Sequence, residues 1–163
     1  MRRLILFRHA KAEAGRSGGD FERGLTNRGR REALAMGKVL AAENLAPDLV
    51  LTSTARRARE TWSCASPALP EAQVETSEAL YNAGPAAILR EIRKVGARAQ
   101  TVAVVGHNPG LQELAVSLVV QGAGSASDSQ RLAKDFPTST AAVFLVDASD
   151  RFSLENLFLP ERR

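Results

Sequence analysis

The stretch LILFRHAKA, residues 4–12, runs four apolar residues directly into an arginine and a histidine. A short apolar run bounded by polar residues is typical of a strand buried on both faces of a sheet, so we predict a strand over 3–7. Arg8 and His9 then stand at its carboxyl end. Open α/β sheets bind ligands at the carboxyl ends of their strands, which makes this position the first candidate site.

The rest of the chain alternates strand and helix signals. Further strand patterns occur at 48–53, 72–77, 101–106, 139–148 and 151–159. Helical patterns occupy 27–44, 55–66, 85–96 and 111–122. Thr26 is a candidate N-cap of the helix over 27–44. Pro85 lies in the first turn of the helix over 85–96, and Gly96 ends it. The last two strands are predicted to pair as an edge hairpin. This order predicts one domain over 1–163, a three-layer α/β/α sandwich with a mostly parallel central sheet.

Two segments are predicted to be loops because glycine and small polar residues dominate them. Residues 13–24, EAGRSGGDFERG, are rich in glycine and charge. Residues 123–130, AGSASDSQ, are small and polar, and we expect a mobile loop there whose part 123–129 is a candidate for a partial lid.

Polar side chains follow each of the three buried strands. They are Arg8 and His9 after the first, Ser53 and then Arg57 after the second, and His107 and Asn108 after the third. If these strands are neighbours, the groups converge on one crevice. The chain has only two histidines, and both stand just beyond a buried strand.

Two arginines and two imidazoles around one point suit a tetrahedral dianion such as a phosphoryl group. Guanidinium groups offer fixed pairs of donors to phosphate oxygens. An imidazole can also act as a nucleophile and form a covalent phospho-enzyme. We therefore expect phosphoryl transfer, which needs mainly in-line positioning and charge stabilisation. We expect no metal and no other cofactor.

The composition limits the other classes of function. The net charge of +4 and the pI near 9.8 are compatible with nucleic-acid binding, but the basic residues lie in short clusters and aromatics make up only 5%. We therefore expect no nucleic-acid partner. The first apolar run is too short for a signal peptide or a membrane span, and Cys64 is the only cysteine. These features predict a cytoplasmic protein without membrane association.

Four segments resemble, in the expected order, the signature motifs of the histidine phosphatase superfamily, whose fold is phosphoglycerate-mutase-like. The segments are LFRHAKA (6–12), DFERGLTNRG (20–29), TSTARRARETW (52–62) and VVGHNPG (104–110). The last third of the chain is similar only in general pattern. Within the superfamily, the chain most resembles the small SixA-type phosphohistidine phosphatases.

The resemblance implies a role for each matching residue. His9 would be the nucleophile that becomes phosphorylated. Arg8 and Arg57 would bind the phosphoryl oxygens, and His107 would hydrogen-bond one of them and stabilise the transition state. Arg23, in the second motif, would close over the phosphate.

Four other residues are less clearly assigned. Glu78 is the nearest candidate for a general acid, although an exposed glutamate near a helix start is an equally good interpretation. Asn108 is a candidate donor to the substrate. Trp62 and Tyr81 are interpreted as packing residues.

We expect a metal-independent phosphatase that hydrolyses phosphohistidine on a protein partner, such as a phosphotransfer domain or phosphocarrier, through a covalent intermediate on His9. Imidazole leaves more easily than an alkoxide, so a weak or missing acid favours this substrate. Two alternatives remain: a small-molecule phosphomonoesterase, which a functional Glu78 would favour, and a phosphoprotein-binding module without turnover.

Overall fold

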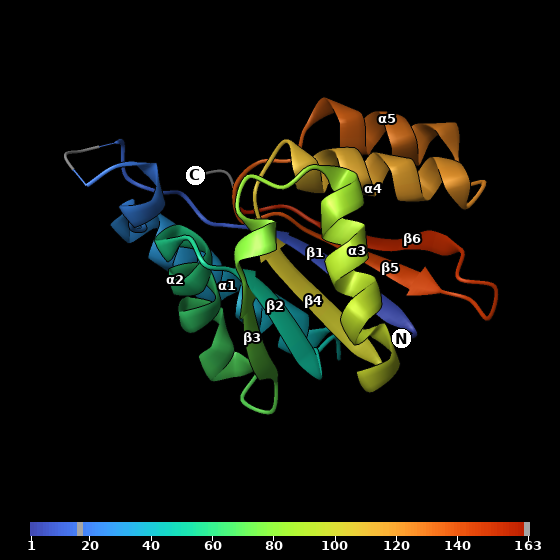
Figure 1. Ribbon diagram of the computed structural model, residues 1–163, viewed down its shortest axis with the longest axis horizontal. Helices are drawn as coiled ribbons and strands as arrows, with labels where there is room; N and C mark the ends of the chain where they lie inside the picture. The colour runs from blue at the N-terminus through green and yellow to red at the C-terminus, as the bar shows by residue number, and fades with distance from the viewer. Residues whose placement is uncertain (16–17, 162–163) are drawn as a thin grey trace.

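The computed structural model describes residues 1–15 and 18–161, and its centre is one six-stranded sheet (Figure 1). The strands are β1 (Arg3–Arg8), β2 (Leu49–Ser53), β3 (Gln73–Ser77), β4 (Thr101–Gly106), β5 (Ala141–Val146) and β6 (Phe152–Phe158). Their order across the sheet is β3-β2-β4-β1-β5-β6. The predicted strands are therefore confirmed, including the final pair, whose outer member β6 lies at one edge.

The sheet is mostly parallel, as predicted. Strands β3, β2, β4 and β1 pair in parallel, whereas β5 is antiparallel to both β1 and β6. In the register of the central pair, Arg8 at the end of β1 is level with Gly106 at the end of β4. The residues that follow β1, β4 and β2 consequently emerge at the same edge of the sheet.

Helices cover both faces of the sheet and complete the three layers (Figure 1). The helices are α1 (Asn27–Ala42), α2 (Arg56–Ala65), α3 (Pro85–Val95), α4 (Gly110–Gln121) and α5 (Ala126–Lys134). Short 3₁₀ turns are η1 (Asp20–Glu22), η2 (Ser66–Ala68), η3 (Glu78–Leu80) and η4 (Gly96–Arg98). None of the helices within 1–15 and 18–161 has both the length and the apolar character needed to cross a membrane.

The side chains of each central strand divide between two hydrophobic cores. In β1, Leu4 and Leu6 pack toward α3, α4 and α5, whereas Ile5 and Phe7 pack toward α1 and α2. All four are fully buried. A strand covered on both faces needs a continuous apolar run rather than an alternating one, which explains the pattern at the start of the chain.

The start of α1 ties this helix to the segment that follows β1. The hydroxyl of Thr26 accepts a hydrogen bond from the backbone N–H of Gly29 at 3.0 Å, as predicted for an N-cap. The same hydroxyl donates to the carbonyl oxygen of Lys11 at 3.1 Å. This cap therefore supports the chain two residues after His9.

The prediction of a loop over 123–130 was wrong, because most of this segment belongs to helix α5. The hydroxyl of Ser125 accepts the backbone N–H of Asp128 and caps the helix. Leu132, fully buried, and Phe136 anchor the segment in the core beside α4. A single buried leucine in a short helix gives almost no periodic signal, so the small polar residues dominated the prediction.

We predict that Thr26→Ala lowers the free energy of unfolding by about 1 kcal/mol, because an N-cap acceptor is lost. Thr26→Ser keeps the hydroxyl and should stay close to the wild type. Urea unfolding followed by circular dichroism measures both. Equal stability of the alanine variant and the wild type would contradict the capping role.

Candidate active site

The carboxyl ends of β1, β4 and β2 open into a cavity of about 370 Å³. The sequence predicted that seven side chains would meet at this edge or close over it, and six of them line the cavity: Arg8, His9, Arg23, Arg57, His107 and Asn108. The seventh, Ser53, is fully buried and does not line the cavity. The imidazole centroids of His9 and His107 lie 5.2 Å apart. The parallel pairing of the three strands therefore produces the predicted convergence.

His9 is held in one tautomer. Its Nδ1 lies 2.8 Å from the carbonyl oxygen of Ala10, which can only accept, so Nδ1 carries the ring proton. Its Nε2 accepts a hydrogen bond from Nε of Arg57 at 3.3 Å. The unprotonated nitrogen of His9 consequently faces the arginine that is predicted to bind phosphate.

His107 is oriented by Ser53, the last residue of β2. The Nε2 atom of His107 lies 2.8 Å from the Ser53 hydroxyl, which also accepts the backbone N–H of Ala55 at 3.2 Å. Nδ1 of His107 is buried and has no hydrogen-bond partner among the described residues. When the Ser53 hydroxyl donates to Nε2, the ring proton is on Nδ1, which can then donate to a ligand.

Arg57 supplies a buried guanidinium group and Arg8 a partly buried one. Arg57, in the first turn of α2, is 4% exposed although arginine is rarely buried. Nη1 of Arg8 donates to the carbonyl oxygen of Phe136 at 2.7 Å, and its buried Nε has no partner within the described parts of the chain. Arg56 and Arg59 are exposed, so Arg57 is the arginine of this cluster that faces the site.

Arg23 lies at the rim of the cavity and holds two parts of the loop 13–24 together. Its Nε donates to Oδ1 of Asp20 at 3.0 Å, and its Nη1 donates to the carbonyl oxygen of Glu13 at 3.0 Å. The side chain of Arg23 is only partly buried. It therefore lies at the edge of the site, and its predicted closure over a phosphoryl group remains a prediction.

Glu78 and Asn108 gain less support from the geometry. Glu78, the first residue of η3, is exposed and does not line the cavity. Asn108 does line it, but its amide nitrogen donates to Gln112 and to the carbonyl oxygen of Phe136. The general-acid role of Glu78 and the donor role of Asn108 remain predictions.

The sequence analysis did not identify several residues of the site. Lys11, Asp20, Asn82 and Thr138 also line the cavity. The packing interpretation of Tyr81 was incomplete, because its hydroxyl donates to Asp20 at 2.6 Å and its ring packs edge-on against His107. No local pattern marks these positions, although Asp20 does lie inside the second motif.

Burial keeps both histidines neutral at physiological pH. It is the main reason that the pKa of His9 falls from its ordinary 6.5 to about 3, and the nearby positive charges of Arg57 and Arg8 act in the same direction. Burial and the charge of Arg57 likewise lower the pKa of His107 to about 4. His9 therefore presents an unprotonated nitrogen, the form required of a nucleophile.

A sequence model of the histidine phosphatase superfamily (branch 1) matches residues 4–85, which is half of the chain. The chain belongs to this superfamily. The match includes three of the four motifs, and the resemblance drawn from the sequence is confirmed. With this assignment, the cavity is the candidate active site of a histidine phosphatase.

Relatives of this histidine phosphatase are similar over nearly the whole chain. The candidate phosphohistidine phosphatase SixA of Agrobacterium tumefaciens is 32% identical with a TM-score of 0.84, and 98% of each chain is covered. Its counterpart from Nakamurella multipartitia is 33% identical with a TM-score of 0.86, covering 98% of this chain and 96% of that one. An uncharacterized protein of Mycobacterium tuberculosis is 39% identical over 139 residues, 85% of this chain and 86% of that protein.

We predict that the histidine phosphatase loses stability as the pH falls from about 6.5 to about 5. The pKa values of His9 and His107 are about 3 and about 4 in the native state and 6.5 ordinarily. In this window the unfolded chain binds protons that the native state excludes, so the free energy of unfolding rises with pH and its full value is present above 6.5.

Urea unfolding at several pH values between 5 and 7 measures this slope. In His107→Asn, one of the two titrating groups is gone, and the slope should decrease by up to ~1.4 kcal/mol per pH unit. Parallel pH profiles for the variant and the wild type would show that burial does not suppress protonation of His107.

Proposed function

We propose that this histidine phosphatase hydrolyses phosphohistidine on a partner protein, with His9 as the nucleophile. Nε2 of His9 attacks phosphorus, an N–P bond forms, and the P–N bond to the substrate imidazole breaks. Water then attacks the phosphorus of phospho-His9, releasing inorganic phosphate and regenerating the imidazole. The reaction as proposed uses only groups of this chain and water.

The observation that carries the proposal is the orientation of the His9 ring. The carbonyl oxygen of Ala10 accepts the hydrogen bond from Nδ1–H, and burial keeps the ring neutral, so Nε2 carries no proton. Its lone pair points toward Nε of Arg57, a residue that lines the cavity. A phosphate-binding module has no need of such an imidazole. An enzyme that forms a covalent intermediate does need it.

Two buried donors without partners support a phosphoryl group as the ligand. Nε of Arg8 and Nδ1 of His107 are buried without hydrogen bonds in the part of the chain that the structure describes. A buried donor left unpaired costs about 1–3 kcal/mol, so such groups are normally paired. In the proposal both donate to phosphoryl oxygens and stabilise the charge that develops in the transition state.

The carboxyl groups near the site favour a substrate with a good leaving group. Asp20 is the only acid in the cavity lining, considering residues 1–15 and 18–161, and hydrogen bonding from Tyr81 lowers its pKa to about 2. It is therefore ionised and cannot protonate an alkoxide at neutral pH. Glu78 lies outside the cavity. An imidazole leaving group needs such an acid less than an alkoxide does.

The relatives and the composition support the remaining parts of the proposal. The SixA proteins that cover nearly the whole chain are named for phosphohistidine hydrolysis. We propose a phosphotransfer domain or phosphocarrier as the partner, since either presents a phosphohistidine at its surface. The single cysteine, Cys64, favours a reducing compartment, and we propose the cytoplasm.

We predict that the wild type releases phosphate from a phosphohistidine-bearing protein much faster than from p-nitrophenyl phosphate, with EDTA present. His9→Ala should hydrolyse neither substrate, because no covalent intermediate can form. Arg57→Ala should lower kcat/KM by roughly 100-fold or more, since a preorganised charged donor is lost. Phosphate release at equal enzyme concentration measures all three proteins.

Arg59→Ala is the matched control, because Arg59 lies on the same helix, is exposed and does not line the cavity. It should retain the wild-type rate. Faster hydrolysis of the ester would instead indicate a phosphomonoesterase. Failure of the wild type on both substrates would overturn the proposed activity and leave the cavity as a binding site.

A further inference from the structure

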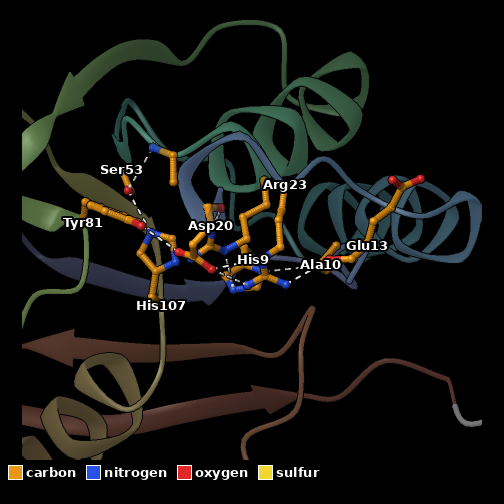
Figure 2. A network of polar contacts seen from close by, with 10 residues as sticks. His9, Ala10, Glu13, Asp20, Arg23, Ser53, Tyr81 and His107 are labelled. Carbon is orange, nitrogen blue, oxygen red and sulfur yellow. Dashed lines mark hydrogen bonds and ion pairs between the residues drawn. The ribbon is translucent and has the colours of Figure 1, made fainter. Parts of the chain in front are cut away.

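The carboxylate of Asp20 occupies the mouth of the active site and accepts hydrogen bonds from three side chains (Figure 2). Its Oδ2 accepts from the Tyr81 hydroxyl at 2.6 Å and from Nη2 of Arg57 at 3.1 Å. Its Oδ1 accepts from Nε of Arg23 at 3.0 Å. Two of these partners are the arginines that were predicted to bind and cover a phosphoryl group.

Each nitrogen of the Arg57 guanidinium makes one hydrogen bond, so three of its five N–H groups are in use. Nε donates to Nε2 of His9 at 3.3 Å, Nη1 donates to the carbonyl oxygen of Asp20 at 2.9 Å, and Nη2 donates to its carboxylate. A phosphoryl group that faces Nε2 of His9 must place oxygens beside this guanidinium. It therefore meets donors that Asp20 already holds.

Charge makes it unfavourable for Asp20 and a substrate to share these donors. The positive charges of Arg23 and Arg57 balance the negative charge of the Asp20 carboxylate. A phosphoryl dianion beside this carboxylate would add two negative charges that repel it. The side chain of Asp20 is 49% exposed. It can therefore turn toward water without burying its charge, so its displacement requires no rearrangement of the core.

We propose that Asp20 is an internal competitor of the phosphoryl group: its carboxylate takes the donors of Arg57 and Arg23, and the substrate phosphoryl group displaces it. This inference rests on the proposed function, since it takes the cavity as a phosphoryl site. It makes Asp20 a residue that sets affinity. Inorganic phosphate, the product, uses the same donors, and the return of the carboxylate favours its release.

Titration calorimetry of inorganic phosphate against the full chain tests the proposal. Asp20→Asn removes the negative charge but keeps the size of the side chain, so it should bind phosphate about tenfold more tightly, or more, because charged hydrogen-bond partners are set free. The matched control is Glu22→Gln. Glu22 lies in the same 3₁₀ turn and is exposed, and it does not line the cavity, so its loss should leave the affinity unchanged.

Thermal unfolding supplies a second measurement. Without phosphate, Asp20→Asn should have a lower Tm than the wild type, because the positive charges of Arg57 and Arg23 lose their counter-ion. Addition of phosphate should then raise the Tm of the variant more than that of the wild type, since a ligand that binds the native state stabilises it according to its affinity.

Unchanged or weaker phosphate binding by Asp20→Asn would overturn the proposal, as would an equal gain in Glu22→Gln. Absence of phosphate binding in both Asp20→Asn and the wild type would overturn it too. Phosphohistidine turnover, measured on the same wild-type preparation, separates the two hypotheses. If Asp20→Asn binds phosphate more tightly but the wild type does not hydrolyse phosphohistidine, the proposed competition stands and the proposed activity is wrong. If the wild type hydrolyses phosphohistidine but the variant binds phosphate with unchanged affinity, the proposed activity stands and the proposed competition is wrong.

Discussion

The parallel pairing of β1 with β4 and of β4 with β2 is the constraint on which the site depends. It brings the carboxyl ends of three strands to one edge, so the residues after them must share a small volume. Arg8 and His9, Arg57, and His107 come from three segments that are far apart in sequence, and they contribute to one cavity only for this reason. The strands are buried on both faces, which fixes the edge at which these residues emerge.

Electrostatics then decides how these four groups coexist. One buried and one partly buried guanidinium group next to two buried imidazoles would be a costly cluster if every group were charged, because burial penalises charge and like charges repel. The pKa values of both histidines are depressed, so the rings are neutral, and Asp20 neutralises part of the arginine charge. The neutrality of His9 is also what makes Nε2 a nucleophile, so one physical effect serves both the stability of the cluster and its chemistry.

Both backbone carbonyls and side chains orient the residues of the site through hydrogen bonds. Rigid backbone carbonyls of Ala10 and Phe136 fix His9 and Arg8, and Ser53 at the end of β2 fixes His107. The acceptor that can move is the exposed carboxylate of Asp20, on a 3₁₀ turn outside the sheet. The residues predicted to be catalytic are therefore oriented by backbone carbonyls and by Ser53 at the end of β2, whereas the group proposed to yield to substrate belongs to a 3₁₀ turn.

The layers, the mostly parallel sheet, the cap at Thr26 and the convergence of Arg8, His9, Arg57 and His107 could all be predicted from the sequence, because they depend on local apolar runs and on the residues directly after each strand. The sequence did not reveal α5, where one buried leucine gives no period, nor the placement of Glu78 outside the cavity. Tertiary packing alone established the tautomer of His9, the Ser53–His107 contact and the position of Asp20 between Arg57, Arg23 and Tyr81. Most of these contacts join segments distant in sequence, and their geometry is fixed by packing that no local pattern records.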